Sequence, residues 1–452
     1  MSETTTKPNT RSRTSGQVKP GYKKTQIGII PEDWEVRKLI TQANVDKENI
    51  SSDFNGEYIN YVSLSDIQNG KIFPNKIEYK SAPSRAKRVT QEGDVLLATV
   101  RPNLKNFAII DRPNIIASTG FAVLGYKKME LRFLYNFLYS HYAEKQYFAL
   151  TVGSNYPALN SNDVKNLKLP IPPLPEQEAI ADCLTTWDKG IEKLSALIAA
   201  KKEQKKGLMQ QLFNGQLTID NKQWNNEQLS MNNVQLKRVE NEEDRLKGWK
   251  KVRLGDLGKT FNGLTGKTKD DFGVGLPFVS YLNVFRNNKI EENTSFDYVN
   301  IESSENQNTL NYGDLIFTTS SETPNEVGIS SVVLFKPKEK LHLNSFCFGM
   351  RLNDFSILKP EYAVYLLRGQ NFRREMYKLA QGSTRYNLSK ASFVKIQITV
   401  PSLEEQTAIA EVLTAADKEI ELLEQKLEAF KLQKKGLMQV LLTGEKRLID
   451  NE

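Results

Sequence analysis

The chain has few of the residues from which metal sites and disulfide frameworks are built. Its 452 residues include only two cysteines, Cys183 and Cys347, and two histidines, His141 and His342. Two thiols cannot make a disulfide framework or a thiolate cluster, and two imidazoles add little to a ligand set. We therefore expect no metal on this chain.

Long apolar runs are also missing. No stretch approaches the length of a membrane span, and no charged-then-apolar secretory leader opens the chain. We expect a soluble, cytoplasmic protein without a membrane partner. Lys and Arg outnumber Asp and Glu by 62 to 54, a net charge of +8. A basic excess favours polyanionic partners such as DNA, although many proteins with no nucleic-acid role are equally basic.

Catalytic signatures are absent as well. The segment 263–268 has two residues between its glycines, where a phosphate-binding loop has four. The Pro172-Pro173 pair lacks the preceding Asn or Asp and the following aromatic with which an amino-methyltransferase grips a flipped base. Glu203 and Lys205 have the acid-x-lysine spacing of some nucleases, but they belong to a helix full of such pairs. We expect no catalytic residue.

What the chain does contain is a tandem repeat. Leu-Pro-Glu-Gln-Glu-Ala-Ile-Ala at 174–181 returns as Leu-Glu-Glu-Gln-Thr-Ala-Ile-Ala at 403–410, and Lys-Lys-Gly-Leu-Met-Gln at 205–210 returns at 434–439. Both pairs are offset by the same 229 positions, so no insertion or deletion separates the two landmarks. One unit is therefore used twice.

Each copy carries apolar residues at alternating spacings of four and three, which form one narrow stripe on a helix. Ser402 and Glu405 suit a capping box, Pro175 a first helical turn, and Gly215 and Gly444 helix stops. Each helix should run for about 40 residues, or about 60 Å. We expect the two stripes to pack on each other as an antiparallel coiled coil and form a rigid spacer; the alternative is that each packs onto its own domain. The stripe residues are Ile180, Leu184, Trp187, Ile191, Leu194 and Ile198 in the first copy, and Ile409, Leu413, Ile420, Leu423, Leu427 and Phe430 in the second.

The repeat extends less regularly into the segments before the helices, where offsets drift from 215 at Trp34 and Trp249 to 229 at the Gly-Ser pairs. These segments mix β-rich runs with helical stretches at 131–149 and 360–379, so the fold class is α+β. The predicted organisation is a disordered tail (1–22), a first globular domain (23–173), a long helix (174–214), a linker (215–245), a second globular domain (246–401), a second long helix (402–444) and a C-terminal tail (445–452).

The globular segments offer polar and basic loops suited to DNA. Cations contact phosphates, while guanidinium and amide groups can read base edges. Each of these loops could equally be an ordinary polar turn. The candidates in the first half are Arg85, Lys87, Arg88, Arg101, Asn103, Lys105, Asn106, Ser154, Asn155 and Tyr156. Those in the second half are Ser320, Ser321, Thr323, Asn325, Ser383, Thr384, Arg385, Tyr386 and Asn387.

Taken together, these features resemble the specificity subunit of a type I restriction-modification system. The features that carry the resemblance are the doubled module, the Pro-containing segments 169–177 and 398–406, and the long helices with Lys-Lys-Gly-Leu-Met-Gln near their ends. Trp34 and Trp249, and the Gly-Asp turns at 93–94 and 313–314, fit the same pattern. The second copy lacks the Pro-Pro pair.

The resemblance implies that each globular segment is a target-recognition domain reading one half of a two-part sequence in double-stranded DNA, with the paired helices fixing the gap. It also implies two modification subunits that methylate adenine, and restriction subunits that translocate and cut DNA. S-adenosylmethionine, ATP and Mg²⁺ would serve those subunits, with no cofactor on this chain. Two other hypotheses stay open: an enzyme with an unrecognised centre, and a coiled-coil DNA-binding or adaptor protein without sequence specificity.

Overall fold

The computed structural model describes residues 18–51, 53–151, 157–219, 236–382 and 384–448. The chain divides into two compact units, and each long helix contributes to both of them. Unit 1 comprises residues 1–194 and 426–452, and unit 2 comprises residues 195–425. No helix in the described ranges is long and apolar enough to cross a membrane.

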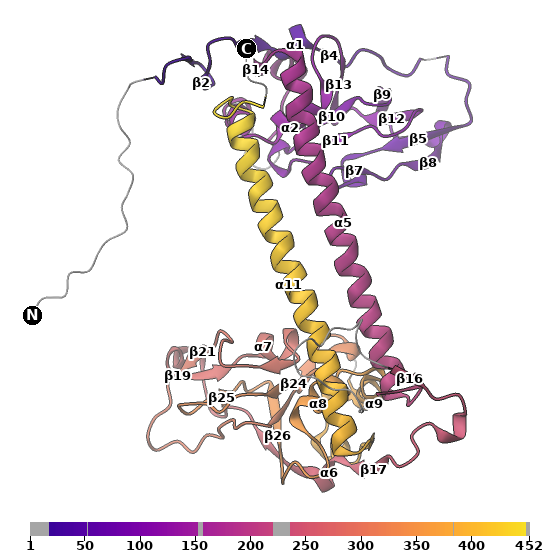
Figure 1. Ribbon diagram of the computed structural model, residues 1–452, viewed down its shortest axis with the longest axis vertical. Coiled ribbons are helices and arrows are strands. Elements are labelled where there is room, and N and C mark those ends of the chain that lie inside the picture. Colours follow the sequence, from indigo (N-terminus) through magenta and orange to yellow (C-terminus); the bar gives the residue numbers. More distant parts are fainter. Residues whose placement is uncertain (1–17, 52, 152–156, 220–235, 383, 449–452) are drawn as a thin grey trace, which may run out of the picture. The chain divides into compact units, whose positions relative to one another are not determined.

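The two long helices form where the apolar stripes predict them, and each is one continuous helix (Figure 1). They are α5 (Leu174–Phe213) and α11 (Leu403–Leu441). Gly215 and Gly444 follow the helices at φ values of 64° and 69°, the left-handed conformation that suits glycine at a helix end. The Ser402 hydroxyl accepts a hydrogen bond from the Glu405 N–H at 3.3 Å, which is one half of the predicted capping box.

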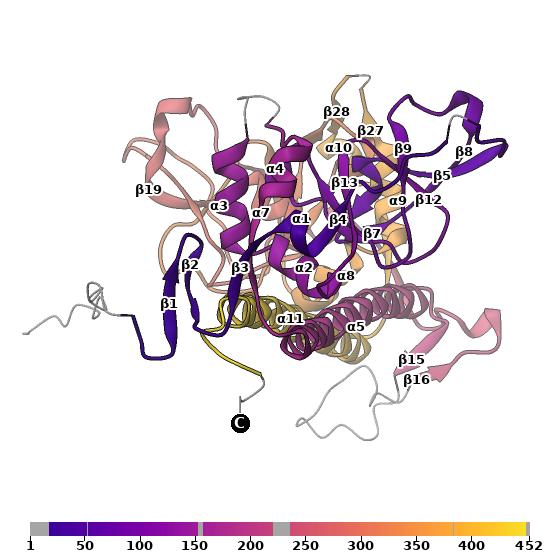
Figure 2. The same cartoon turned by 90° about the horizontal axis from the view of Figure 1, so that it is seen from above.

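Unit 1 contains two four-stranded sheets, ordered β11-β10-β13-β4 and β8-β5-β12-β9, and the antiparallel pair β3–β14. All neighbours in the two sheets are antiparallel except β5 and β12, which are parallel. The β1–β2 hairpin lies at one side of the unit (Figure 2). The strands are β1 (Tyr22–Thr25), β2 (Gly28–Pro31), β3 (Glu35–Lys38), β4 (Ala43–Val45), β5 (Tyr58–Val62), β6 (Ile67–Gln68), β7 (Lys71–Ile72), β8 (Asn75–Glu78), β9 (Ala86–Val89), β10 (Val95–Ala98), β11 (Ala108–Ile109), β12 (Ile115–Ser118), β13 (Phe121–Tyr126) and β14 (Lys168–Ile171). The shorter helices are α1 (Leu39–Gln42), α2 (Leu131–Leu138), α3 (His141–Leu150) and α4 (Ser161–Asn166).

Unit 2 repeats this plan with longer connections. Its main sheet is ordered β18-β26-β22-β24-β20, beside the sheets β21-β19-β25 and β23-β28-β27 and the pair β17–β29. The strands are β15 (Leu217–Ile219), β16 (Leu236–Arg238), β17 (Lys250–Arg253), β18 (Gly258–Asn262), β19 (Phe272–Val279), β20 (Lys289–Ile290), β21 (Asp297–Val299), β22 (Leu315–Thr318), β23 (Ser320–Ser321), β24 (Ser330–Val333), β25 (His342–Leu343), β26 (Cys347–Leu352), β27 (Ala380–Gln381), β28 (Tyr386–Leu388) and β29 (Gln397–Val400). The shorter helices are α6 (Leu254–Leu257), α7 (Tyr281–Arg286), α8 (Pro360–Leu366), α9 (Gln370–Leu379) and α10 (Lys390–Phe393).

The apolar stripes have two destinations. Ile180 and Leu184 at the start of α5 belong to the core of unit 1, and Ile409 and Leu413 at the start of α11 belong to the core of unit 2. The first turns of each helix therefore follow the alternative interpretation and pack onto their own domain. Of the remaining stripe residues, Leu194, Ile198 and Ile420 are buried, whereas Trp187, Ile191, Leu423, Leu427 and Phe430 are half-buried.

Beyond their first turns, α5 and α11 contact each other within each unit. In unit 1 the rings of Trp187 and Phe430 meet edge to face, with centroids 5.4 Å apart. In unit 2 Lys201 pairs with Glu419 at 2.7 Å. Residues near the start of one helix thus meet residues near the end of the other, so the helices are antiparallel, as predicted.

The buried glutamine of the repeated Glu-Gln motif explains one of the landmarks. The Gln177 side chain accepts the Glu130 N–H at 3.0 Å and donates to the Pro172 carbonyl at 2.8 Å. The equivalent Gln406 accepts the Lys359 N–H at 2.9 Å and donates to the Pro401 carbonyl at 3.1 Å. In both units the long helix is thereby joined to the residue that precedes a shorter helix, α2 or α8.

Three segments differ from the predicted organisation. Tyr22, expected in a disordered tail, begins β1, and its hydroxyl donates to the Gly444 carbonyl at 2.8 Å. The expected linker contains the paired strands β15 and β16. In the expected C-terminal tail, Arg447 forms ion pairs with Asp33 at 2.9 Å and with Glu176. Partners distant in the sequence order these segments, and composition cannot reveal such partners.

Candidate nucleic-acid interface

In unit 1, three polar segments converge on the turn formed by residues 118–120. The Thr99 N–H donates to the Gly120 carbonyl at 2.9 Å, and the Thr99 carbonyl accepts the Leu159 N–H at 2.8 Å. The Thr119 N–H donates to the Arg85 carbonyl at 2.8 Å. The fold therefore brings together the Arg85 segment, the loop after β10 and the chain that follows residue 156.

The loop after β10 has an unusual backbone. Arg101 and Lys105 flank a short 3-10 turn, with φ values of 51° and 52°. Residues other than glycine rarely adopt positive φ, and such positions cluster at binding and catalytic sites. The Arg101 N–H donates to the Pro157 carbonyl at 2.8 Å, which joins this loop to the segment after residue 156.

The predicted unit 1 residues fall into two groups. Arg85, Lys87, Arg101 and Asn103 are exposed. The other three described residues have internal partners: Arg88 pairs with Asp46 at 3.1 Å, Lys105 pairs with Glu144 at 3.3 Å, and the Asn106 amide donates to the Leu64 carbonyl at 3.4 Å. Each of these three side chains thus has an internal partner, and its contact with DNA stays a prediction. Ser154, Asn155 and Tyr156 lie outside the described residues.

Unit 2 holds its segments with the same backbone hydrogen bonds. The Thr319 N–H donates to the Phe346 carbonyl at 2.9 Å, and the Thr319 carbonyl accepts the Leu388 N–H at 2.9 Å. Thr319, Phe346 and Leu388 of unit 2 are thus the equivalents of Thr99, Gly120 and Leu159 of unit 1. Strands β23 and β28 then pair antiparallel, so two loops that are about 65 residues apart in the sequence lie side by side.

Most of the predicted unit 2 residues are accessible. Thr323, Asn325, Thr384, Arg385 and Asn387 are exposed, and Tyr386 is half-buried. Ser320 and Ser321 are buried in β23, and the Ser321 hydroxyl donates to Glu326 at 2.7 Å. We remove these two serines from the candidate set because burial keeps them from a ligand. Ser383 lies outside the described residues.

Arg373 on α9 binds the backbone of the loop that contains Asn325. The sequence did not indicate this residue. Its guanidinium donates to the Gly328, Asn325 and Val327 carbonyls at 2.6, 2.7 and 2.9 Å. Burial lowers the pKa of Arg373 to about 10. The side chain thereby holds the loop that presents Asn325. An arginine within a helix carries no signal in the sequence that separates this role from an ordinary surface cation.

Phe346 is a second residue that the sequence did not indicate. Its side chain is 53% exposed, and the Arg385 guanidinium lies 5.5 Å from the ring centroid. Nothing in the local sequence brings 346 and 385 together, because their contact depends on the pairing of distant strands.

The segments discounted as catalytic have structural partners. Lys267, in the glycine-containing segment, is buried and pairs with Glu305, and this ammonium group lowers the pKa of Glu305 to about 2. Glu203 pairs with Lys206 at 3.5 Å on an exposed helix face. Within the described ranges, no group of three or more His, Cys, Asp or Glu residues is close enough to hold a metal ion.

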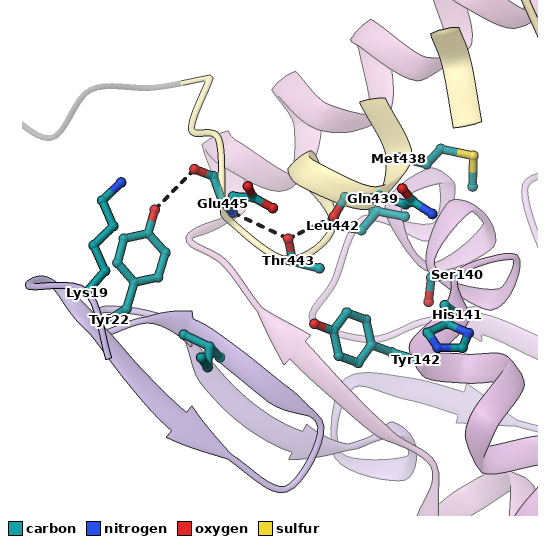
Figure 3. A pocket seen from close by; sticks show the side chains of 11 residues that line it. Lys19, Tyr22, Ser140, His141, Tyr142, Met438, Gln439, Leu442, Thr443 and Glu445 are labelled. Atoms are coloured by element: carbon teal, nitrogen blue, oxygen red, sulfur yellow. Dashed lines mark hydrogen bonds between the residues drawn. The ribbon is translucent and has the colours of Figure 1, made fainter. Parts of the chain in front are cut away.

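Each unit also contains a pocket at equivalent positions of the repeat. In unit 1 a pocket of about 490 Å³ lies between the end of α11 and the start of α3, with Met438 and Gln439 on one wall and Ser140, His141 and Tyr142 on the other (Figure 3). In unit 2 a pocket of about 710 Å³ is lined at the matching positions by Met209, Gln210, Gly369, Gln370 and Asn371. The repeated Leu-Met-Gln landmark therefore supplies the same two side chains to both pockets.

Comparison with known proteins identifies similar sequences and folds. The family model described as the type I restriction modification DNA specificity domain matches residues 31–202 and 246–432. The type I restriction enzyme MjaVIII specificity subunit of Methanocaldococcus jannaschii is 26% identical over 93% of this chain and 94% of its own length. The type I restriction enzyme EcoKI specificity subunit of Escherichia coli K12 is 21% identical over 84% of this chain and 82% of its own.

Solved structures show the same fold. A chain from a study of complex assembly and conformational transition of the type I restriction-modification system aligns with a TM-score of 0.60 and 23% identity, covering 92% of this chain and 99% of its own. The type I restriction-modification S subunit from M. genitalium aligns with a TM-score of 0.50 and 13% identity, covering 90% and 96%. At these identities the likeness concerns the fold alone.

Proposed function

Since this chain belongs to the type I restriction-modification DNA specificity family, we propose that it is the non-catalytic subunit that reads a two-part DNA target. Unit 1 would read one half of the target and unit 2 the other. The observation that carries this proposal is the equivalent framework around Thr99 and Thr319, which holds different side chains at its tips. A shared backbone framework that carries different exposed side chains would let both units bind DNA in the same way while reading different sequences.

The exposed side chains differ between the units in a way that fits two half-sites. Arg85, Lys87 and Arg101 give unit 1 several cations, which suit phosphates and guanine edges. The exposed candidate residues of unit 2 are mainly hydroxyls and amides, and Arg385 is the cation among them. Amides suit adenine edges, and hydroxyls can bond to any base. The two halves of the target would therefore differ in sequence.

We also propose that the chain is the platform on which two modification subunits assemble. The equivalent pockets support this arrangement, because a repeated wall of Met and Gln in each unit suits one partner bound twice (Figure 3). Methylation of adenine with S-adenosylmethionine would belong to those subunits. ATP-driven translocation and cleavage, with Mg²⁺, would belong to restriction subunits.

Two linked units gain specificity through effective concentration. Once one unit is bound, the other meets its half-site at a concentration set by the connection between them. Two moderate affinities then become one strong binding event only where the half-sites have the matching gap. The paired helices α5 and α11 would set this gap.

The test is to co-express the chain with its modification subunit in a host that lacks adenine methylation and to map methylated adenines across the genome. A two-part motif with a constant gap, absent without this chain, is the expected result. Arg101→Ala should relax one half of the motif and Arg385→Ala the other, while the complex still assembles. A verified complex that methylates no such motif would contradict sequence reading and favour an adaptor without specificity.

A further inference from the structure

One turn of the candidate interface has the same hydrogen bonding in both units but a different last residue. It comprises residues 118–120 in unit 1 and 344–346 in unit 2. In unit 1 the Gly120 N–H donates to the Ser118 hydroxyl at 3.2 Å. In unit 2 the Phe346 N–H donates to the Asn344 side-chain oxygen at 2.9 Å. Strands β13 and β26, each six residues long, begin directly after these turns. Unit 2 therefore carries an aromatic ring where unit 1 has no side chain.

The turn that presents Phe346 is firmly held. The Cys347 N–H donates to the Asn344 carbonyl at 3.0 Å, and the Asn344 N–H donates to the Val279 carbonyl at 3.0 Å. Gly263 packs directly beneath the turn, since a Cβ at this position would lie 2.0 Å from the Asn344 carbonyl oxygen. A ring on such a turn loses little freedom when it binds a ligand, which favours binding.

Exposure of one aromatic ring is ordinary in a protein surface and is not by itself evidence of a site. The second observation is Arg385, whose guanidinium lies 5.5 Å from the centre of the Phe346 ring. A cation near an aromatic face is attracted by the ring, so the two side chains form one composite surface. We name Phe346 and Arg385 together the Phe-Arg pair. It lies where the Thr319 and Arg385 loops meet.

The chemistry of the Phe-Arg pair matches two base edges of the DNA major groove. A guanidinium can donate two hydrogen bonds to O6 and N7 of guanine, and an apolar side chain can contact the C5 methyl group of thymine. Successive bases are stacked about 3.4 Å apart. Side-chain groups 5.5 Å apart can therefore reach neighbouring base pairs.

We propose that the half-site read by unit 2 contains a thymine adjacent to a guanine, with Phe346 against the thymine methyl group and Arg385 on the guanine. The inference rests on the proposed function, because it requires unit 2 to read a half-site. Unit 1 cannot make the thymine contact in this way, because Gly120 occupies the equivalent position.

The experiment uses the assembled methyltransferase complex and duplexes that carry its mapped target. Each thymine is replaced in turn by deoxyuridine, which removes only the methyl group, and dissociation constants are measured. For the native chain, replacing one thymine of the unit 2 half-site should raise the dissociation constant about fourfold, which is the effect expected for the loss of one buried methyl group. With Phe346→Ala the same replacement should have no effect, and with Phe346→Leu a partial effect should remain.

A separate part of the experiment tests the guanine contact. Replacing the neighbouring guanine by 7-deazaguanine removes the N7 acceptor, so binding by the native chain should weaken while binding by Arg385→Ala should not weaken further. Phe148→Ala is the matched control, since Phe148 is an exposed ring (64%) on α3 of unit 1. It should show the native sensitivity to both base replacements.

Three outcomes would overturn the inference. They are a unit 2 half-site without adjacent thymine and guanine, equal sensitivity of Phe346→Ala and the native chain to deoxyuridine, and a loss of affinity in Phe346→Ala that is the same for every duplex. The last would indicate a wedge between base pairs. None of them removes the two-part motif, so they are distinct from a failure of the proposed function, in which no such motif is methylated.

Discussion

At the scale of single residues, two arginines of unit 2, Arg368 and Arg373, are matched to particular backbone carbonyls. Arg368 donates to the Ser330, Val284 and Asn287 carbonyls at 2.7, 2.8 and 2.7 Å. Burial, together with the nearby charge of Arg373, lowers the pKa of Arg368 to about 10. A buried guanidinium is tolerated because carbonyl oxygens replace its lost water. Arg368, which lies between α8 and α9, and Arg373, which lies on α9, thus bind backbone carbonyls of neighbouring segments of unit 2.

His342 provides a prediction about pH. It is buried in β25, its Nδ1 lies 2.9 Å from the Asn308 carbonyl, and burial lowers its pKa below the ordinary value of about 6.5. The unfolded chain therefore binds a proton more readily than the folded chain. This destabilisation is absent above the unfolded pKa, grows as pH falls through it, and is complete below the folded pKa. Unit 2 should lose stability between about pH 7 and about pH 5.5.

The measurement is urea unfolding followed by amide hydrogen exchange in β25 and β26. The urea concentration at the midpoint is compared at about pH 7 and about pH 5.5 for the native chain and for His342→Gln. The variant should show a smaller fall in midpoint. His141→Gln is the control, since His141 is exposed on α3 of the other unit. An equal fall in the native chain and His342→Gln would assign the pH effect to other groups.

At the scale of elements, two lysines at equivalent positions of the long helices form reciprocal ion pairs. Lys205 on α5 pairs with Asp417 on α11, and Lys434 on α11 pairs with Asp188 on α5 at 2.6 Å. Both lysines and both aspartates are related by the offset of 229. A charge that meets its partner only at one helix alignment helps to specify that alignment. These pairs thus select the register of α5 and α11 within each unit.

The environments of the two pairs differ, which yields a prediction about stability. Lys205 and Asp417 are 16% and 32% exposed, and the Tyr365 hydroxyl also donates to Asp417 at 3.0 Å. Asp417→Asn should lower the free energy of unfolding of unit 2 by about 1–2 kcal/mol, between the values for exposed and buried pairs. Glu203→Gln, in the exposed Lys206 pair, should change it by about 0.5 kcal/mol or less.

A double-mutant cycle with Lys205→Met and Asp417→Asn, followed by urea unfolding, measures the coupling between the two charges. The reversed pair, Lys205→Asp with Asp417→Lys, should recover part of the lost stability. Additive effects in the cycle would show that the pair contributes nothing beyond its separate residues.

At the scale of the whole molecule, each unit combines residues from distant parts of the chain. The first part of α5 and the last part of α11 belong to unit 1, and the other parts of both helices belong to unit 2. The division falls between Leu194 and Ser195 in α5 and between Gln425 and Lys426 in α11. An insertion at both points leaves the internal contacts of each unit in place.

This division permits a direct test of the proposed spacer. Seven residues inserted at both points add two helical turns, or about 10.5 Å, which corresponds to about three base pairs. The methylated motif should keep both half-sites while its gap lengthens by about that amount. The same insertion in α5 alone should impair assembly, because it shifts the register of α5 relative to α11. An unchanged gap in the doubly extended chain would contradict the spacer role.

The sequence by itself determined the doubled architecture and both long helices. Helix α5 was expected over 174–214 and runs from Leu174 to Phe213, because its stripe, first turn and glycine stop are local signals. The α+β class and the Gly215 and Gly444 stops rest on local signals too. The family resemblance rested on the same landmarks, which are repeated without insertion in the helices.

Only the tertiary structure decided which polar residues face solvent and which have internal partners. Arg85 and Arg88 look alike in the sequence, yet Arg85 is exposed and Arg88 pairs with Asp46. Lys205 lies on α5, and its partner Asp417 lies 212 positions away on α11. Phe346 meets Arg385 because β23 and β28 pair. Helix formation depends on neighbours within a few residues, whereas burial and pairing depend on groups brought together from distant segments, and these appear only when the chain has folded.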